Sequence, residues 1–391
     1  MAALSLQPAF AASDVIDYTF KGGSDGFYPN GGMAAIKGTL YGTTKFGGGS
    51  TGCGDTQGYI PGCGTVFSLT RKGVEKILHV FSLTDGSWPV AGLVNVGGVF
   101  YGTTLAGGTG TSCGSLGCGT VFSVTRKGVF KVLHNFTSGQ DGSTPYAGLV
   151  NVGGVLYGTT QAGGLYSYGT VFSITPAGNE SVIYSFKGNG DGRSPNAPLV
   201  NVGGLLYGTT KNGGIYGTSG GAAGFGTAFS ITTAGAETVL HSFGLNTDGT
   251  DPFGALVDVG GMLYGTTYSG GAYGYGAVYS LTHSGAESLL YSLGSGNDGL
   301  YGVGALLNMS GLLYGTTQEG GTAGHGTVFN ITTVGAENVV HSFLGGSDGA
   351  APYNDSMTNV SGVLHGATAY GGLANAPCGT SGCGTVFHLT P

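Results

Sequence analysis

Residues 85–108 read DGSWPVAGLVNVGGVFYGTTLAGG, and residues 119–136 read GTVFSVTRKGVFKVLHNF. With substitutions, this phrase occurs seven times along the 391-residue chain. Its Tyr-Gly-Thr-Thr element begins at Tyr41, Tyr101, Tyr157, Tyr207, Tyr264 and Tyr314, and the last copy has His365-Gly-Ala-Thr instead. A fixed period of this length is typical of supersecondary units that stack or surround an axis, so the repeat determines the fold.

Each copy predicts four strands. In the second copy they cover residues 90–96, 99–104, 119–125 and 129–136. Short turns of Gly-Gly and Arg-Lys-Gly join the first to the second strand and the third to the fourth, which indicates antiparallel hairpins. Consecutive apolar residues in the third and fourth strands favour a sheet covered on both faces. Repeated four-stranded sheets of this kind are the blades of a β-propeller.

The Asp-Gly pairs give the number of blades. They begin at Asp25, Asp85, Asp141, Asp191, Asp248, Asp298 and Asp348, which predicts seven blades. Residues 15–20 read as a fourth strand without a blade, and residues 384–390 end the chain on a third strand. We expect these two segments to pair and close the ring, because closure removes two exposed sheet edges. The prediction is one all-β, seven-bladed propeller domain over residues 14–391.

Residues 1–13 resemble the end of a signal peptide, because Ala9-Phe10-Ala11 matches an A-x-A cleavage pattern. The alternative is a disordered terminus. No apolar run reaches the roughly 20 residues that a membrane helix needs, so no membrane span is expected.

The six cysteines form three local pairs in the same part of the repeat: Cys53 with Cys63, Cys113 with Cys118, and Cys378 with Cys383. An even number of closely spaced cysteines predicts three loop disulfides and an oxidising compartment. Zinc binding by the thiolates is the alternative, but zinc sites usually have closer Cys-x-x-Cys spacing and often histidine partners. Together with the signal-peptide-like pattern of residues 1–13, the cysteines predict a secreted, periplasmic or cell-surface protein of a bacterium.

Charge is distributed unevenly. All 12 Lys and Arg residues lie at or before Lys211, whereas residues 212–391 contain ten Asp and Glu residues and no Lys or Arg. Nothing basic is clustered to neutralise phosphates, so nucleic acid is excluded as a partner. The acidic half either attracts cations or basic surfaces, or reflects drift in a lysine-poor repeat.

The loops predict which face is functional. In an up-and-down blade, the connections between strands two and three and between successive blades lie on one face, and they hold most of the variation. Variable loops on a rigid scaffold often carry function. Aromatic residues beside polar groups on this face are typical of sugar binding. Our ligand-binding candidates are Trp88, Tyr28, Tyr146, Phe253, Tyr301 and Tyr353. Each ring has the alternative role of packing over a neighbouring loop.

The Asp of each Asp-Gly pair is expected to accept backbone N–H bonds in its own turn. One Asp per loop does not provide the several spaced oxygen ligands that calcium needs, so we predict no metal and no cofactor, with calcium as the alternative.

A catalytic group is expected where the repeat is broken. The candidates are Glu319, His325, Asp251 and Asp355, since a carboxylate and a histidine can perform general acid–base catalysis.

The repeat resembles the bacterial GloVer tandem repeat of "choice-of-anchor" surface proteins in three motifs: Tyr-Gly-Thr-Thr, Gly-Thr-Val-Phe-Ser and Val-Leu-His-Ser-Phe. The resemblance covers nearly the whole chain after residue 14 and implies export, but no particular activity or functional residue. The double glycines are also similar to those of kelch-type propeller blades.

These observations predict an exported propeller that binds a carbohydrate or cell-surface glycan through its variable loops. The first alternative is a polysaccharide-active enzyme, a lyase or a hydrolase. The second is a structural surface protein that assembles with copies of itself.

Overall fold

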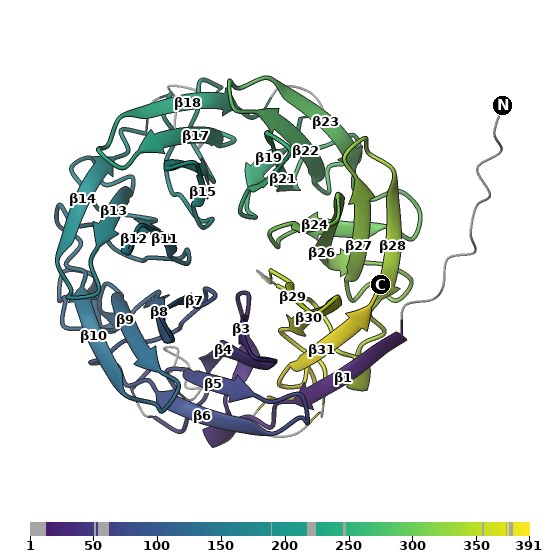
Figure 1. Ribbon diagram of the computed structural model, residues 1–391, viewed down its shortest axis with the longest axis horizontal. Helices are drawn as coiled ribbons and strands as arrows, with labels where there is room; N and C mark the ends of the chain where they lie inside the picture. Colours follow the sequence, from purple (N-terminus) through teal and green to yellow (C-terminus); the bar gives the residue numbers. More distant parts are fainter. Residues whose placement is uncertain are drawn as a thin grey trace.

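The computed structural model describes residues 13–50, 52–53, 62–188, 190–216, 224–244, 248–353, 356–372, 374 and 378–391. Seven antiparallel sheets surround a central axis like the blades of a propeller (Figure 1). The predicted all-β fold with seven blades is confirmed. In the described part of the chain, no helix is long and apolar enough to cross a membrane.

The strands of the first four blades follow one another from the axis outward (Figure 1). Blade 1 contains β3 (Ala34–Ile36), β4 (Thr39–Phe46), β5 (Thr65–Leu69) and β6 (Glu75–Val80). Blade 2 contains β7 (Val94–Val96), β8 (Val99–Thr104), β9 (Thr120–Thr125) and β10 (Phe130–Asn135). Blade 3 contains β11 (Val150–Val152), β12 (Val155–Thr160), β13 (Thr170–Ile174) and β14 (Glu180–Ser185). Blade 4 contains β15 (Val200–Val202), β16 (Leu205–Thr210), β17 (Thr227–Thr232) and β18 (Glu237–Ser242).

The remaining blades repeat this order. Blade 5 contains β20 (Val257–Val259), β21 (Met262–Ser269), β22 (Ala277–Thr282) and β23 (Glu287–Ser292). Blade 6 contains β25 (Leu307–Met309), β26 (Leu312–Gly320), β27 (Thr327–Thr332) and β28 (Glu337–Ser342). Blade 7 contains β29 (Thr358–Val360), β30 (Val363–Thr368), β31 (Thr385–Thr390) and β1 (Ser13–Thr19). Short additional strands are β2 (Phe27–Pro29), β19 (Thr250–Pro252) and β24 (Gly299–Gly302), and 3-10 turns cover Gly23–Asp25, Gly114–Leu116 and Gly346–Asp348.

Ring closure occurs as predicted. β1 pairs antiparallel with β31, with Ser13 opposite Thr390 and Ile16 opposite Phe387. The pairing continues beyond the strand, since the Phe20 N–H donates to the carbonyl of Gly384 at 3.1 Å. The first strand of the chain is thus the outermost strand of the last blade (Figure 1).

The hydrophobic core lies between the blades. Tyr101 and Leu133 of blade 2, for example, pack in one cluster with Leu156, Phe172 and Ile174 of blade 3. Each sheet is therefore covered on both faces, which explains the consecutive apolar residues of its third and fourth strands. In each blade a β-bulge interrupts the pairing of these two strands; in blade 2 it lies between Val132 and His134. The bulge turns the side chain of the extra residue, here Leu133, toward the next blade.

The innermost strand is shorter than predicted. The sequence predicts a strand over residues 90–96, but β7 begins only at Val94. The preceding segment pairs with the neighbouring blade instead, since the Thr43 hydroxyl of blade 1 donates to the carbonyl of Ala91 at 3.3 Å. The Thr103 hydroxyl of blade 2 donates in the same way to the carbonyl of Ala147 of blade 3 at 2.9 Å. These Ala- and Gly-rich segments line a cavity of about 20 Å³. That volume holds about one water molecule, so the small residues close the axis.

Candidate functional site

The two kinds of variable loop form one face. In blade 2, the N–H of Ser87 donates to the carbonyl of Ala106 at 2.7 Å, and the Ala106 N–H donates back to Ser87 at 3.0 Å. Ser87 belongs to the Asp-Gly loop and Ala106 to the connection between strands two and three. Equivalent pairing joins these loops in the other blades through bridges or the short strands β2, β19 and β24. We call this surface the variable-loop face.

A ring of residues in left-handed backbone conformation holds this face together. The residue three positions after each repeat Asp has φ between +50° and +61°: Tyr28, Trp88, Thr144, Ser194, Asp251, Tyr301 and Ala351. Its N–H donates to a carbonyl of the preceding blade, as Trp88 does to Cys63 at 2.9 Å and Asp251 to Phe225 at 2.9 Å. Left-handed conformation costs a non-glycine residue about 1–2 kcal/mol. The chain contains 85 glycines but places none at these positions, so every blade presents a side chain here.

Aromatic side chains from four blades meet over the axis on this face. Phe253 of blade 5 lies 5.9 Å from Tyr146 of blade 3 and 6.0 Å from Tyr353 of blade 7, between ring centroids. Tyr353 in turn lies 6.5 Å from Tyr28 of blade 1. Burial raises the pKa of Tyr146, as does its hydrogen bond with Tyr353. Residues far apart in sequence therefore form one continuous surface.

Further rings extend this surface on two sides. Tyr268 lies 6.1 Å from Phe253 and stacks on Tyr301 at 4.8 Å. On the other side, Phe46 lies 5.7 Å from Tyr28 and 6.3 Å from Trp88. The aromatic cluster, as we define it, comprises Tyr28, Phe46, Trp88, Tyr146, Phe253, Tyr268, Tyr301, Tyr353 and Tyr370.

Charged groups border the aromatic cluster. The Lys45 ammonium lies 4.9 Å from the Phe46 ring centroid and 5.5 Å from that of Tyr28, and burial lowers its pKa. Burial raises the pKa of Asp251, which the positive charge of Lys211 partly offsets. Burial also raises the pKa of Tyr268, and Glu319 and Asp251 are among the charges that add to this rise. The pairing of β19 with β21 places Asp251 opposite Tyr268, and Glu319 follows Gln318, whose Oε1 accepts a hydrogen bond from the Tyr268 hydroxyl at 3.4 Å.

All six aromatic residues proposed as ligand contacts belong to the aromatic cluster. Phe253 is buried, while the other five are half-buried. Sequence reasoning missed Lys45, Phe46 and Tyr268, which follow Thr-Thr in their repeats. The residue directly after Thr-Thr differs strongly between the copies (Lys45, Leu105, Gln161, Lys211, Tyr268, Gln318 and Ala369), and this variation was the available signal.

The catalytic candidates are only partly brought together. Glu319 and His325 are both exposed, and Asp251 is half-buried. The ring of His325 lies against Gly345, where an added Cβ would approach Nε2 to 2.7 Å. Tyr168, Phe225 and Tyr275 occupy the same repeat position and pack on glycines in the same way. His325 thus follows the repeat in its packing. Asp355 lies outside the described residues.

The three predicted disulfides are present. They join Cys53 to Cys63, Cys113 to Cys118 and Cys378 to Cys383, with Cα–Cα distances of 5.1, 5.2 and 5.2 Å. Cys63, Cys118 and Cys383 occupy the repeat position that Tyr168, Phe225, Tyr275 and His325 fill elsewhere. The long loops are therefore held by a disulfide in three blades and by a packed ring in the other four.

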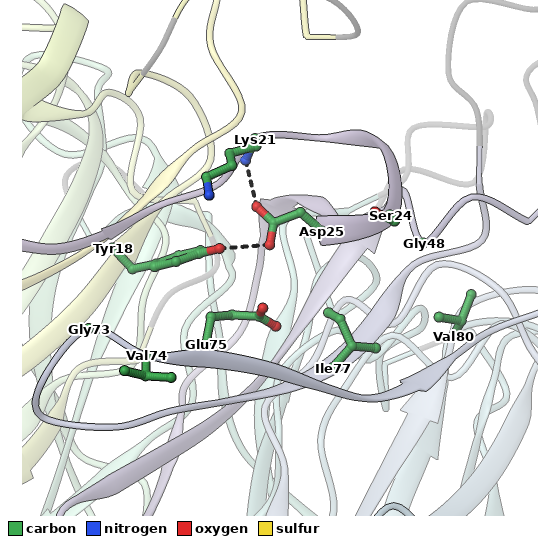
Figure 2. Close-up of a pocket in the computed structure, with 10 residues that line it drawn as sticks. All are labelled: Tyr18, Lys21, Ser24, Asp25, Gly48, Gly73, Val74, Glu75, Ile77 and Val80. Atoms are coloured by element: carbon green, nitrogen blue, oxygen red, sulfur yellow. Dashed lines mark hydrogen bonds between the residues drawn. The ribbon is translucent and has the colours of Figure 1, made fainter.

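A groove of about 760 Å³ lies on the outer rim, between β1 and β6 (Figure 2). Asp25 accepts hydrogen bonds from the Tyr18 hydroxyl and from the Lys21 N–H, both at 2.7 Å. Burial and the nearby charge of Asp25 raise the pKa of Glu75 to about 7, although Lys21 opposes the rise. Tyr184, Asp191 and Glu237 repeat this arrangement elsewhere in the ring. A feature that recurs in this way is structural.

The repeat Asp residues cap their own turns, as predicted. Ser82 N–H donates to Asp85 at 2.7 Å, Thr137 N–H to Asp141 at 2.9 Å, and Leu344 N–H to Asp348 at 2.6 Å. Each Asp also faces the Tyr or His of the preceding fourth strand; His134 Nε2, for example, lies 3.2 Å from Asp141. These contacts are made within the protein, although Asp191 Oδ1 is buried without a hydrogen-bond partner.

The fold and its loop face define a seven-bladed β-propeller with an aromatic surface over its axis. The model of the Gloeobacter/Verrucomicrobia repeat matches residues 5–219 and 215–387, so the chain belongs to this repeat family. A search of curated protein sequences gives no match.

Several solved structures share the fold. Virginiamycin B lyase from Staphylococcus aureus superposes with a TM-score of 0.61 at 13% identity, covering 97% of this chain and 99% of the lyase. A streptogramin B lyase gives a TM-score of 0.60 at 14% identity, covering 97% of each chain. A putative 6-phosphogluconolactonase from Bacteroides uniformis gives 0.50 at 14% identity, covering 79% of this chain and 83% of that one. At such low identity, these similarities concern the fold alone.

Proposed function

We propose that the protein is an exported carbohydrate-binding propeller whose aromatic cluster contacts the sugar. The observation that carries this proposal is the meeting of Tyr28, Tyr146, Phe253 and Tyr353 over the axis from four different blades. The C–H face of a pyranose stacks on such rings, while its hydroxyls form hydrogen bonds with groups at their edges. Lys45, Asp251 and Glu319 are the charged groups available there.

The ligand in this proposal lies across the face. The axial cavity of about 20 Å³ is too small for a sugar ring. A chain of several sugar units matches an open surface of linked rings better than a monosaccharide does. The left-handed loops and the disulfides hold these rings in place before the ligand arrives, which limits the entropy lost on binding.

Export is part of the same proposal. Three disulfides persist in an oxidising compartment outside the cytosol. A secreted, periplasmic or surface-anchored protein would meet glycans there, which is consistent with the surface proteins that carry the GloVer repeat.

Binding to a panel of polysaccharides, followed by isothermal titration with the oligosaccharide fragments of any that bind, tests the proposal. Tyr353→Ala and Trp88→Ala are expected to weaken binding at least about fivefold, because a stacked ring contributes about 1–3 kcal/mol. Tyr166 and Tyr273 are 46% and 54% exposed on the same face but outside the aromatic cluster, so their alanine variants are the matched controls. Equal binding by Tyr353→Ala and wild type would contradict the proposal.

A polysaccharide lyase or hydrolase is the second candidate. The observation in its favour is that Asp251, whose pKa burial raises, and Glu319 both lie near Tyr268. A carboxylic acid and a carboxylate in different surroundings are the usual pair for glycoside cleavage. Release of unsaturated products or new reducing ends, abolished in Asp251→Asn and Glu319→Gln, would favour the enzyme.

Concentration-dependent assembly without any glycan would favour a structural surface protein instead.

A further inference from the structure

Blade 7 departs from the repeat at three positions that meet in space. In blades 1 to 5, the Tyr of Tyr-Gly-Thr-Thr lies directly opposite a Ser on the third strand, as Tyr101 lies opposite Ser123; in blade 6 it lies opposite Asn330. In blade 7 the corresponding pair is His365 and His388. The third position is the bulged residue of the fourth strand, which is Asp17 in blade 7. Elsewhere it is Leu78, Leu133, Ile183, Leu240, Leu290 or Val340.

These three side chains converge. His388 Nδ1 lies 2.8 Å from Asp17 Oδ1, and His365 Nδ1 lies 3.1 Å from Asp17 Oδ2. The bulge directs the carboxylate toward the two imidazoles, which lie side by side on neighbouring strands. One ligand atom from each residue lies within 4.8 Å of those of the other two. Within the described parts of the chain, no other three His, Cys, Asp or Glu side chains gather in this way.

Packing alone does not account for this substitution. In blade 2 the equivalent Tyr101 and the bulged Leu133 belong to the hydrophobic cluster between the blades. The polar groups in blade 7 are mostly shielded, with 12%, 26% and 15% of the side chains of His365, His388 and Asp17 exposed. Three simultaneous changes to metal-ligating residue types, at the positions that the register brings together, indicate a site.

We propose that Asp17, His365 and His388 bind a divalent metal ion of the zinc type. Two imidazole nitrogens and one carboxylate oxygen form a ligand set that favours zinc over calcium or magnesium, which prefer oxygen ligands throughout. Three protein ligands leave one tetrahedral position open. With bonds of about 2.0–2.1 Å, tetrahedral ligands lie roughly 3.3 Å apart. The two observed contacts, at 2.8 and 3.1 Å, are made to different oxygens of Asp17, so a metal bound by one of these oxygens requires a small rearrangement of the three side chains.

Asp17, His365 and His388 line a cavity of about 330 Å³ together with Arg71 and Ser361. Arg71 belongs to the turn between the third and fourth strands of blade 1, and Ser361 to the turn between the first two strands of blade 7. This places the cavity at the junction where the ring closes, on the face opposite the variable loops. Water or an anionic oxygen ligand suits a metal position beside a guanidinium. The metal site is independent of the proposed carbohydrate binding.

Titration of the untagged, chelator-treated protein with zinc chloride alone tests the proposal. One-to-one binding is expected by calorimetry, with a rise in the melting temperature, and cobalt(II) should give a visible spectrum typical of nitrogen and oxygen ligands.

His365→Tyr and His388→Ser restore the residues that other blades carry, so these variants should fold. Each is expected to bind zinc at least about 100-fold more weakly, as loss of a ligand exceeds the 10–100-fold effect of an outer-shell change. The matched control is His283→Thr, which removes a histidine that pairs with Asp258 at 2.8 Å but restores the Thr of blades 4 and 6. It should leave zinc binding unchanged. Absence of saturable one-to-one binding by the wild type, or undiminished binding in both restored variants, would overturn the proposal.

Discussion

The left-handed residues of the variable-loop face show how one backbone position serves the whole ring. Ala351 has φ +50°, and its N–H donates to the carbonyl of His325 in the preceding blade at 2.8 Å. The hydrogen bond is made by the backbone, so any residue that adopts this conformation can provide it. Only the side chain differs between blades, from Ala351 to Trp88.

Ala351→Gly is therefore expected to stabilise the protein. Glycine removes the strain of the left-handed conformation and keeps the hydrogen bond, which gives about 0.5–1 kcal/mol after the greater chain entropy of unfolded glycine is subtracted. Urea denaturation measures this as an increase in the free energy of unfolding. The control is Ala367→Gly in β30, where glycine lacks this advantage and should cost about 0.5–1 kcal/mol. Equal losses in both variants would mean that position 351 is not strained.

The disulfides also act at the scale of single loops. Cys113 and Cys118 are five positions apart, so their bond closes a short loop. The double change Cys113→Ser and Cys118→Ser is expected to lower the free energy of unfolding by about 2 kcal/mol, the entropy gained by a loop of this size in the unfolded chain. Reducing conditions open all three disulfides, so calorimetry there should give the wild type and the double variant nearly the same melting temperature. A variant as stable as the oxidised wild type would show that the bond only fixes the loop locally.

At the scale of elements, the N-terminal strand is a full member of blade 7. Phe20 follows β1, is fully buried, and meets the rings of Tyr18 at 5.1 Å and Phe67 at 5.3 Å. Phe186, at the equivalent position after β14, is also fully buried and meets Tyr184 and Phe229 at 5.2 Å. The packing at the ring closure is thus equal to the packing inside the ring.

We expect Phe20→Ala and Phe186→Ala to be equally destabilising, by about 3–4 kcal/mol each, because each leaves a large cavity between two blades. Comparison of their urea denaturation midpoints checks this expectation directly. A much smaller loss in Phe20→Ala would mean that the terminal strand detaches easily and that the remaining blades hold the ring without it.

The strands and their closure were predictable because their signals are local and repeated seven times. The start of the innermost strand was not. Residues 90–93 look like a strand in isolation, but they form hydrogen bonds with the neighbouring blade. The Thr43 hydroxyl of blade 1, for example, donates to the carbonyl of Ala91 at 3.3 Å. Sequence reasoning on one repeat does not include such contacts between blades.

The candidate site was predictable in its aromatic residues from the Asp-Gly loops, but not in Phe46, Tyr268 and Lys45 or in its arrangement. The repeat places the aromatic residues of the Asp-Gly loops on the variable-loop face. Contacts across the axis, such as that between Tyr146 and Phe253, depend on how far each aromatic side chain extends over the centre of the propeller. The Asp17, His365 and His388 site was beyond sequence reasoning, since Asp17 and His365 are 348 positions apart and only ring closure unites them.

At the scale of the whole molecule, the ring contains a repeated pair of carboxyl groups between neighbouring blades. Five glutamates at the start of fourth strands have a pKa raised to about 7, in each case mainly by burial: Glu75, Glu180, Glu237, Glu287 and Glu337. The charge of a repeat Asp adds to the rise in every case. Tyr184 illustrates the chemistry: its hydroxyl lies 2.8 Å from Asp191 and 3.2 Å from Glu237. One hydroxyl proton cannot serve both carboxylates, so protonated Glu237 fits this contact better.

The pH dependence of stability follows from these five groups. Their pKa is about 7 in the folded protein, against 4.5 as the ordinary value, so the folded state binds more protons between these limits. Their favourable contribution is complete below pH 4.5 and is lost as the pH rises through 7. Each group is half-exposed, so solvent screening limits its effect to below about 1 kcal/mol. His134, whose pKa burial lowers, has the opposite effect but is a single group. Melting temperatures should therefore be higher at pH 5 than at pH 8.

Glu180→Gln separates this effect from the general response of a protein to pH. Glutamine resembles the protonated glutamate in shape and hydrogen bonding but carries no charge beside Asp141 at any pH. The variant is expected to be up to about 1 kcal/mol more stable than the wild type at pH 8 and equally stable at pH 5. Glu319→Gln is the control, because Glu319 is exposed and its change should have little effect at either pH. Blade 2 already carries Phe130 in place of this glutamate, with its ring stacked 3.5 Å from that of His79. An uncharged side chain is thus tolerated between blades, and a Glu180→Gln variant less stable at pH 8 would show that the glutamate is ionised and paired there.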